Sequence, residues 1–415
     1  MIVISQTGWI LHKFDILKFV VKLKSASQLF VSHYTTNNCV SLIRGGQHYF
    51  DHLLQLIASA KNTLHLQTYI YEEDETGELV SDALIEAAQR GVKVFLLVDG
   101  YASQALSRAF ISKLSAGGIK FRYFEPLFKS RRFYLGRRLH HKVVVADIQR
   151  ALVGGINVAN HYNDFPGQPA WLDFALCVEG EVVKDLLVQC QKTWNGFQPL
   201  KKIPVLRGVP VFNIPANSRS RVRMRRNDWV RRKYDISLSY LELFSTAEKD
   251  IVLVSSYFLP GRLFRRGIRQ ARERGVAISV IVAGVSDVLM SKMAERYMYE
   301  WLLSKGVRIF EYNRVVLHGK LAICDDRWMT LGSFNVNDIS TYASVELNLD
   351  VEDSNFVGEV RQYLKNEVFP YCTEISLDYM TTHSSVFTRA LEWVAFLSFR
   401  VIFYFFTFYF QRIGR

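Results

Sequence analysis

The sequence predicts an α/β fold of two similar α/β/α sandwich halves with mixed sheets, related by a pseudo-twofold axis, with an active site at their interface. Three observations lead to this prediction. Strand-like and helical segments alternate along the chain, the same order of segments occurs twice, and each copy leads into the same polar motif. Alternating strands and helices are typical of α/β units, and a repeated order predicts two copies of one unit. A length of 415 residues accommodates two or three domains.

The two copies are recognised by their apolar runs and by the glycines that follow their helices. The first copy is expected to contain a strand at 63–71, a helix at 78–89, a strand at 92–98, a helix at 104–114 and a strand at 119–124. The second copy is expected to contain a strand at 250–258, a helix at 263–274, a strand at 276–282, a helix at 294–304 and a strand at 307–312. Glycine after a helix is the usual stop signal.

Each copy then leads into a motif of the form His-x-Lys-x4-Asp. The first copy carries HHKVVVAD from residue 140 and, after six residues, GGIN from residue 154. The second copy carries HGKLAICD from residue 318 and, after six residues, GSFN from residue 332. One such motif is weak evidence, but identical spacing at equivalent places in a repeat is strong evidence against two unrelated core histidines. The motifs therefore predict the chemistry of the protein.

The histidine and lysine of each motif are two residues apart at the start of an apolar, strand-like run. Residues i and i+2 of a strand point to the same face. His140 and Lys142 should therefore project together, as should His318 and Lys320. Two ammonium groups beside two imidazoles suit a substrate phosphate.

The other polar residues of the motifs are assigned by the same reasoning. Asp147 and Asp325 are five residues beyond their lysines, on the opposite strand face, which favours a structural or orienting role. By parity His141 also faces away and is left out. Asn157 and Asn335 can donate amide hydrogens to the phosphate oxygens. The predicted catalytic set is His140, Lys142, Asp147, His318, Lys320 and Asp325.

Each imidazole needs a carboxylate to fix its tautomer, and two acids lie downstream of the motifs at similar places. These are Asp173 and Glu346. One neutral histidine could attack phosphorus while the other, protonated, donates to the leaving alcohol. No metal or other cofactor is expected, because lysines and histidines supply the positive charge and the sequence has no tight cluster of carboxylates.

The composition bounds the partners and the compartment. The net charge of +13 favours nucleic acid, anionic lipid or phosphate groups without choosing among them. Five cysteines, an odd number without a CxxC pair, favour a reducing compartment. The N-terminus is not interpreted as a signal peptide.

A basic stretch at 219–233, interleaved with Trp229, is interpreted as a linker that contacts lipid or substrate phosphate, the alternative being a solvated loop.

The C-terminal segment 390–410 is dominated by Phe, Tyr, Leu, Ile and Val but contains Glu392 and Arg400. A membrane span needs about 20 predominantly apolar residues, so this segment is borderline. Its aromatic residues and basic flanks favour a helix that lies in the lipid interface, rather than a span or a helix packed on the protein's own core.

Five regions follow from these observations. They are an N-terminal segment of unknown role at 1–41, a first half at 42–200, a basic linker at 201–235, a second half at 236–375 and an aromatic membrane-associating segment at 376–415.

The paired motifs resemble those of the phospholipase D superfamily, over about residues 42–375. Segments 69–77 (YIYEEDETG), 256–261 (SYFLPG) and 310–312 (FEY) are most similar to bacterial cardiolipin synthases without N-terminal transmembrane helices. The resemblance implies transfer of a phosphatidyl group between two phosphatidylglycerols with release of glycerol. It further implies His140 as nucleophile and His318 as general acid and base, although the two roles could be exchanged. It implies a protein on the cytoplasmic face of the cell membrane, peripheral or anchored in the interface.

Two other functions use the same sequence differently. A phospholipase or nuclease would keep the chemistry and use water as acceptor; the aromatic tail argues against a soluble nuclease, so no nucleic acid partner is expected. A binding protein without activity is disfavoured by two intact motifs. Both motifs lie on one chain, so a monomer suffices for the site.

Overall fold

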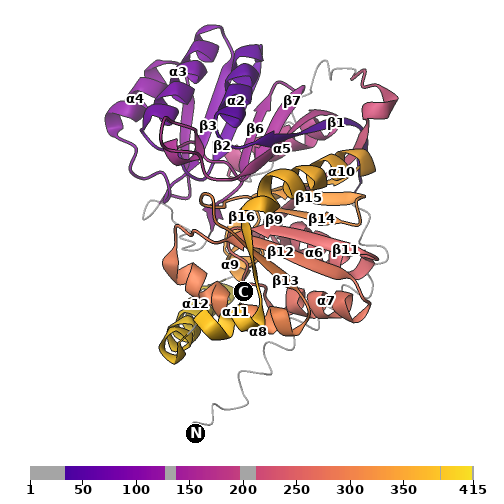
Figure 1. Cartoon of the computed structure of the whole chain (residues 1–415). Coiled ribbons are helices and arrows are strands. Elements are labelled where there is room, and N and C mark those ends of the chain that lie inside the picture. The colour runs from indigo at the N-terminus through magenta and orange to yellow at the C-terminus, as the bar shows by residue number, and fades with distance from the viewer. Residues whose placement is uncertain (1–32, 127–136, 197–211, 384, 414–415) are drawn as a thin grey trace.

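The computed structural model describes residues 33–126, 137–196, 212–383 and 385–413 (Figure 1). Two halves lie one above the other, the first coloured indigo to magenta and the second salmon to yellow. Most of the expected N-terminal segment 1–41 and part of the expected linker 201–235 lie outside the described residues.

The first half contains all five elements expected for it. Its elements are β1 (Thr35–Arg44), α2 (Gln47–Ser59), β2 (Thr63–Thr68), α3 (Glu75–Gln89), β3 (Lys93–Asp99), α4 (Arg108–Ala116), β4 (Lys120–Phe124), β5 (Arg138–Leu139), β6 (Lys142–Ala146), β7 (Arg150–Gly154), β8 (Phe174–Gly180) and α5 (Val182–Trp194). Helix α3 starts earlier than expected because the Asp74 side chain accepts a hydrogen bond from the Gly77 N–H and caps it.

The second half repeats this order. Its elements are β9 (Ser220–Asp228), β10 (Lys233–Tyr234), α6 (Asp235–Thr246), β11 (Asp250–Ser255), α7 (Arg262–Glu273), β12 (Ala277–Ala283), α8 (Leu289–Ser304), β13 (Arg308–Tyr312), β14 (Leu321–Cys324), β15 (Trp328–Gly332), α9 (Asp338–Tyr342), β16 (Ser344–Glu352), α10 (Ser354–Tyr363), β17 (Cys372–Ile375), α11 (Leu377–His383) and α12 (Val386–Ile413). The repeat predicted from the sequence is therefore present.

The sheets are mixed, as predicted. In the first half β2, β3 and β4 are parallel, and β6, β7, β8 and β1 continue the sheet in antiparallel pairs. In the second half β11, β12 and β13 are parallel, and β14, β15 and β16 continue it in antiparallel pairs. Strand β9 pairs with β16 on one side and with β1 on the other, which joins the two halves.

The cores form layers around the two sheets. Residues of α2, α3 and α4 pack with β2 and β3 in one cluster, and residues of α6, α7 and α8 pack with β11 and β12 in another. Between the sheets, a third cluster includes side chains of β7, β8, β15, β16, α5 and α10. Figure 1 shows α5 and α10 at this junction. The buried layer fixes one half against the other, and the motif strands β6 and β14 line it.

The basic stretch 219–233 is not a linker as expected, and its buried arginines face acids of the protein rather than lipid or substrate phosphate. Most of it is strand β9, which pairs with β16 along its whole length. The Arg223 guanidinium is buried, with Nε 2.9 Å from an Asp350 carboxylate oxygen and Nη2 2.7 Å from Glu242. Arg225 donates to the Ser239 hydroxyl at 2.8 Å. These cations are paired inside the protein, where a lone charge would be costly to bury.

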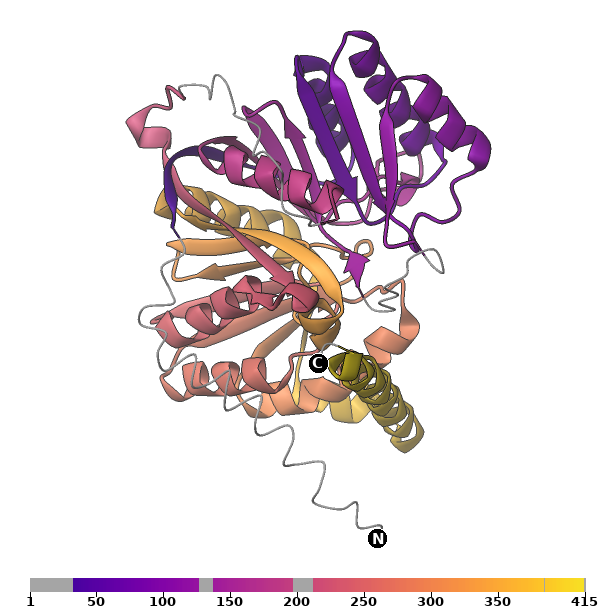
Figure 2. The same cartoon turned by 180° about the vertical axis from the view of Figure 1, so that it is seen from behind.

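The expected boundary at residue 42 falls inside β1, which begins at Thr35 and belongs to the first half. At the other end, α12 packs along α8, and the two views agree on this arrangement (Figures 1 and 2). Among the described residues, no helix reaches the length and apolar character of a membrane span.

Candidate active site

Each motif histidine is held by the backbone of the opposite half. His140 and His141 follow β5, which pairs with β16, and both of their N–H groups donate to the Val345 carbonyl at 3.0 Å. His318 and Gly319 donate to the Leu172 carbonyl at 2.8 and 2.9 Å. The two motifs therefore meet at the junction of the halves, as the pseudo-twofold arrangement predicts.

The carboxylates cross the same junction. Glu346 of the second half lies with Oε2 2.9 Å from Nδ1 of His140 in the first half. Asp173 of the first half lies with Oδ2 2.6 Å from Nδ1 of His318 in the second half. Both carboxylates are fully buried. A carboxylate on Nδ1 keeps the proton there and leaves Nε2 to face the reacting atoms.

Two serine hydroxyls hold the Glu346 carboxylate in this position. The Ser344 hydroxyl donates to Oε1 at 2.7 Å, and the Ser333 hydroxyl donates to Oε2. Burial alone would raise the pKa of Glu346, but His140, Lys142 and Ser333 more than offset it and hold the pKa below its ordinary value. Burial lowers the pKa of His140, although Glu346 opposes this effect. The resting pair is thus a charged carboxylate and a neutral imidazole.

Each motif lysine is buried and contacts the backbone of its own motif histidine. Lys142 donates to the His140 carbonyl at 2.6 Å, and Lys320 donates to the Ser256 hydroxyl at 2.9 Å and to the His318 carbonyl. Burial lowers the pKa of Lys142 to about 7 and that of Lys320 to about 8, while the two carboxylates oppose it. A bound phosphate would supply the missing counter-charge.

The environment of His318 differs from that of His140. The Tyr162 hydroxyl lies 3.4 Å from Nε2 of His318, and the two rings meet edge to face with centroids 5.2 Å apart. Burial lowers the pKa of His318 strongly, and Lys320, Lys142, His140 and His161 add to the effect. Nε2 of His140 has no such hydrogen bond among the described residues; its ring meets Tyr69 instead, at 5.0 Å between centroids.

The two motif asparagines, expected to be equivalent, are placed differently. The Asn157 amide donates to the Tyr162 hydroxyl at 2.7 Å, and its carbonyl accepts from the Ile70 N–H at 3.0 Å. Asn157 therefore links two segments of the first half, at Ile70 and Tyr162, and supports the Tyr162 hydroxyl. Asn335 is also buried, but its side-chain oxygen has no hydrogen-bond partner within the described part of the chain. An amide oxygen accepts hydrogen bonds, so this unpaired atom is suited to a hydroxyl group of a substrate.

Asp147 and Asp325 lie away from the phosphate site and hold turns. The Asp147 carboxylate accepts from the backbone N–H groups of residues 61, 62 and 63 at 2.8–2.9 Å. Asp325 accepts from those of residues 248, 249 and 250 at 2.8–2.9 Å. Both aspartates have positive φ, 52° and 51°. Each fixes the end of its motif strand to the strand beside it, β2 or β11.

Other residues of the site carry no repeated sequence signal. His141 contacts Gln67, with Nε2 2.9 Å from the amide oxygen, and faces away from the site as parity predicts. Ser333 could be predicted from its place in GSFN. Ser256, Ser344 and Tyr162 could not, because the corresponding positions of the other copy do not hold the same residue type.

Within the described ranges, no group of three or more His, Cys, Asp or Glu side chains is arranged to hold a metal ion.

The geometry can support transfer of a phosphoryl group through one histidine. Each imidazole has a carboxylate on Nδ1, two buried ammonium groups lie beside them, and an unpaired amide completes the polar set. Such preorganised positive charge stabilises the charge that develops on a phosphate in the transition state.

Comparison with known proteins agrees with this chemistry. Residues 53–165 and 240–368 match the family described as "Cardiolipin synthase, PLD-like domain". Cardiolipin synthase B of Salmonella typhimurium is 35% identical over 342 residues, which cover 81% of this chain and 82% of that protein.

The chain belongs to this family. Cardiolipin synthase B of Escherichia coli is 33% identical over 342 residues, with the same coverage. Cardiolipin synthase 1 of Bacillus anthracis is 28% identical and is covered over 67% of its length. The crystal structure of phosphatidylserine synthase from Haemophilus influenzae superposes with a TM-score of 0.67 at 16% identity, covering 89% of this chain and 96% of that one. That likeness confirms the two-halved α/β fold.

Proposed function

We propose that this protein is a phosphatidyltransferase that forms cardiolipin from two phosphatidylglycerols and releases glycerol. The observation that carries the proposal is the pair of histidines, each hydrogen-bonded to a carboxylate of the opposite half. This pair supplies a nucleophile and a separate proton carrier at one centre. The cardiolipin synthases matched over four fifths of the chain support the choice of lipid.

In the first step Nε2 of neutral His140 attacks the phosphorus of one phosphatidylglycerol. A nitrogen–phosphorus bond forms and the bond from phosphorus to the headgroup oxygen breaks. The proton held by the Asp173–His318 pair, in which burial raises the pKa of Asp173 to about 7, passes from Nε2 of His318 to that oxygen, so free glycerol leaves. Glu346 stabilises the positive charge that develops on His140, and Lys142 and Lys320 neutralise the phosphate oxygens.

In the second step a headgroup hydroxyl of another phosphatidylglycerol gives its proton to His318 and attacks the same phosphorus. The nitrogen–phosphorus bond breaks and cardiolipin leaves. The surroundings of the two histidines support this assignment of their roles. Tyr162 lies against Nε2 of His318, which suits a group that exchanges protons, whereas the more exposed His140 side chain has Nε2 free for attack. We assign Asn157 to the support of Tyr162 and Asn335 to the substrate, where its amide N–H groups can donate to a phosphate oxygen and its unpaired oxygen can accept from a headgroup hydroxyl.

The proposed location is the cytoplasmic face of the cell membrane, by peripheral association. Helix α12, with Phe387, Trp393 and Val401 exposed, would lie in the lipid interface. Removal of the residues after Ser385 tests this part. Loss of membrane recovery in the truncated protein is expected, and full recovery would show that α12 is not the anchor.

The reaction is tested by incubating the purified protein with phosphatidylglycerol and identifying the products. Cardiolipin and glycerol are expected, and both should disappear in His140→Ala and His318→Ala. Phosphatidic acid with glycerol would indicate hydrolysis by water instead. Cleavage of DNA without lipid turnover would overturn the choice of substrate.

A further inference from the structure

Most of the large apolar side chains that are exposed on the described surface lie in one region. They belong to the loop before α8, the first turn of α8, α9 and α12. The residues are Val285, Val288, Leu289, Met290, Tyr297, Ile339, Phe387, Leu391, Trp393, Val394 and Val401. Isolated exposed apolar residues need no explanation, but a group of them marks an interaction site.

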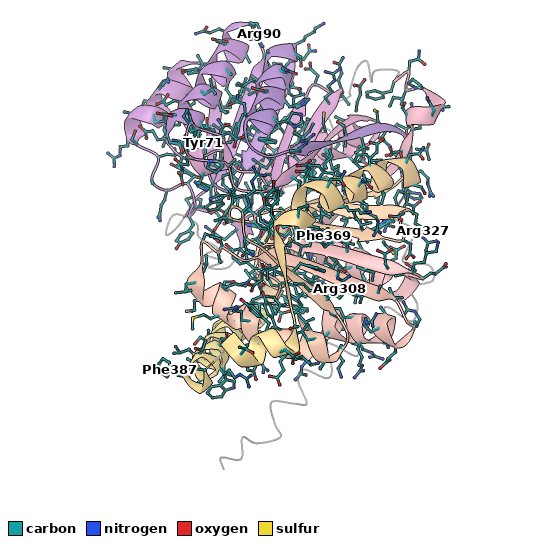
Figure 3. All side chains as sticks on the ribbon, viewed as in Figure 1. Tyr71, Arg90, Arg308, Arg327, Phe369 and Phe387 are labelled. Carbon is teal, nitrogen blue, oxygen red and sulfur yellow. The ribbon has the colours of Figure 1, made fainter. Side chains whose placement is uncertain are left out.

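Helix α12 presents a continuous apolar stripe to the outside. Phe387, Leu391, Val394 and Val401 are spaced by four, three and seven residues, which places them on one helical face. Phe387 is 73% exposed and Val401 is 52% exposed. Figure 3 shows Phe387 at the outer edge of the second half. The opposite face, with buried Glu392 and Ala395, packs onto the protein, so the helix is already docked before any partner binds.

Helix α8, which packs against α12, adds a second exposed apolar turn. Leu289 is 74% exposed, the largest value among the exposed apolar residues. Tyr297, eight residues later, packs against Phe396 of α12 with ring centroids 4.8 Å apart and the two rings tilted by 34°. Helices α8 and α12 are thus in direct contact, so the exposed turn of α8 and the exposed stripe of α12 lie on two neighbouring, packed helices.

This apolar region borders the active site. Asp287, in the loop before α8, accepts a hydrogen bond from the Tyr257 hydroxyl at 2.6 Å, and its charge acts on Lys320 and His161. Its neighbours Val285 and Val288 are exposed. Helix α9, which carries exposed Ile339, begins three residues after Asn335.

We propose that the start of α8, α9 and the outer stripe of α12 form one docking surface for a phospholipid bilayer, through which lipid enters the site sideways. This inference rests on the proposed function. The substrate's acyl chains are apolar and its headgroup must reach the histidines, so a membrane-inserting surface beside the site lets the chains stay in lipid. We call this set the docking surface.

The charges around the docking surface fit anionic lipid. Arg389 and Arg400 are exposed on α12 and lie four and seven residues from exposed Trp393, on the same side of the helix, and the Arg400 guanidinium lies 5.9 Å from the Phe396 ring. Long basic side chains can lie along an apolar surface and place their charge at the level of the phosphates. Apolar insertion flanked by basic residues is typical of interfacial helices.

The test is flotation of the full-length protein with vesicles of phosphatidylcholine and phosphatidylglycerol in similar amounts. Leu289→Glu should lower the vesicle partition coefficient by about tenfold or more, since it places a charge where an apolar side chain enters lipid. Leu79→Glu is the matched control. Leu79 is also exposed, at 44%, but lies on α3 of the first half, and its partition should stay within about twofold of wild type.

A second measurement separates docking from catalysis. Turnover of Leu289→Glu should fall further on vesicles than on short-chain phosphatidylglycerol below its micelle concentration, with an unchanged thermal midpoint. Vesicle partition of Leu289→Glu equal to wild type would overturn the inference. The inference would also be overturned if the wild-type protein proved to be a dimer and Leu289→Glu made it a monomer without changing the partition. This surface would then be an interface between copies of the chain. Absence of cardiolipin formation by the wild-type protein would overturn the proposed function alone.

Discussion

The replacement Glu346→Gln removes one charge from the carboxylate that reaches across the junction to His140. Gln has the same side-chain length as Glu, so its terminal group can still lie 2.9 Å from Nδ1 of His140. The chemistry of the contact changes, because Gln presents either a weak neutral acceptor or an N–H donor to Nδ1. An N–H donor at Nδ1 would hold the wrong tautomer, with the proton on the attacking Nε2.

The size of the effect follows from the burial of the pair. Glu346 is fully buried, so water cannot replace its charge. Loss of a charge-assisted hydrogen bond costs about 1.5–3 kcal/mol, which corresponds to about 10- to 150-fold in rate. An imidazole held in the wrong tautomer loses roughly 10⁴-fold in a comparable hydrogen-bonded pair. We therefore expect kcat for cardiolipin formation to fall by about 10² to 10⁴-fold.

The assay follows cardiolipin formed from phosphatidylglycerol by thin-layer chromatography, with thermal unfolding to confirm that the variant is folded. Ser344→Ala is the matched control, because it removes the 2.7 Å hydrogen bond to Oε1 and leaves Oε2 on His140. It should cost about tenfold or less. A folded Glu346→Gln variant with kcat within about threefold of wild type would refute the assigned role.

Three further predictions concern the other groups of the site. Tyr162→Phe removes the hydroxyl that lies beside Nε2 of His318 and that favours the neutral imidazole, so the pKa of His318 should rise. The limb of the kcat/KM profile that reports this pKa should shift to higher pH by roughly 0.5–1 unit. An unchanged profile would contradict the assigned contact. The lowered pKa values of Lys142, about 7, and Lys320, about 8, predict that kcat/KM declines as the pH rises through this range, and Lys320→Arg, if active, should lose the part of the decline near pH 8. Three backbone N–H groups outweigh burial and lower the pKa of Asp325, so its contribution to stability is present above the unfolded pKa of about 3.9 and is lost as the pH falls through the lower folded value. Asp325→Asn should therefore destabilise the protein by about 2 kcal/mol in urea titrations at neutral pH and by less near pH 3, and an equal loss at both would contradict this account.

Much of the fold could be predicted because local patterns carried it. Buried parallel strands such as β3 and β12 are continuous apolar runs, and the glycines after α3 and α7 have positive φ, where glycine is favoured. Strand β9 could not be predicted, because its arginines suggested exposure. They are neutralised by acids such as Asp350, more than 120 residues away, and no local pattern shows such a pairing.

The site could be predicted as far as strand parity and the repeat reached. Parity separates His140 and Lys142 from Asp147, and the placement of three backbone N–H groups on Asp147 agrees with an orienting role. Parity could not reveal that Asp173 and Glu346 cross to the opposite histidine, because this depends on how the halves pack. Nor could the repeat distinguish Asn157 from Asn335, since only Asn157 has a tyrosine five residues later.

The central claim is that the two histidines form one centre in which His140 carries the phosphatidyl group. The most direct measurement is peptide mapping by mass spectrometry after wild-type protein is mixed with phosphatidylglycerol and quenched in alkaline denaturant, which preserves a nitrogen–phosphorus bond. The account predicts a phosphatidyl adduct on His140 that is absent from His140→Ala. An adduct on His318 would contradict the roles, and cardiolipin formation without any adduct would contradict the covalent mechanism.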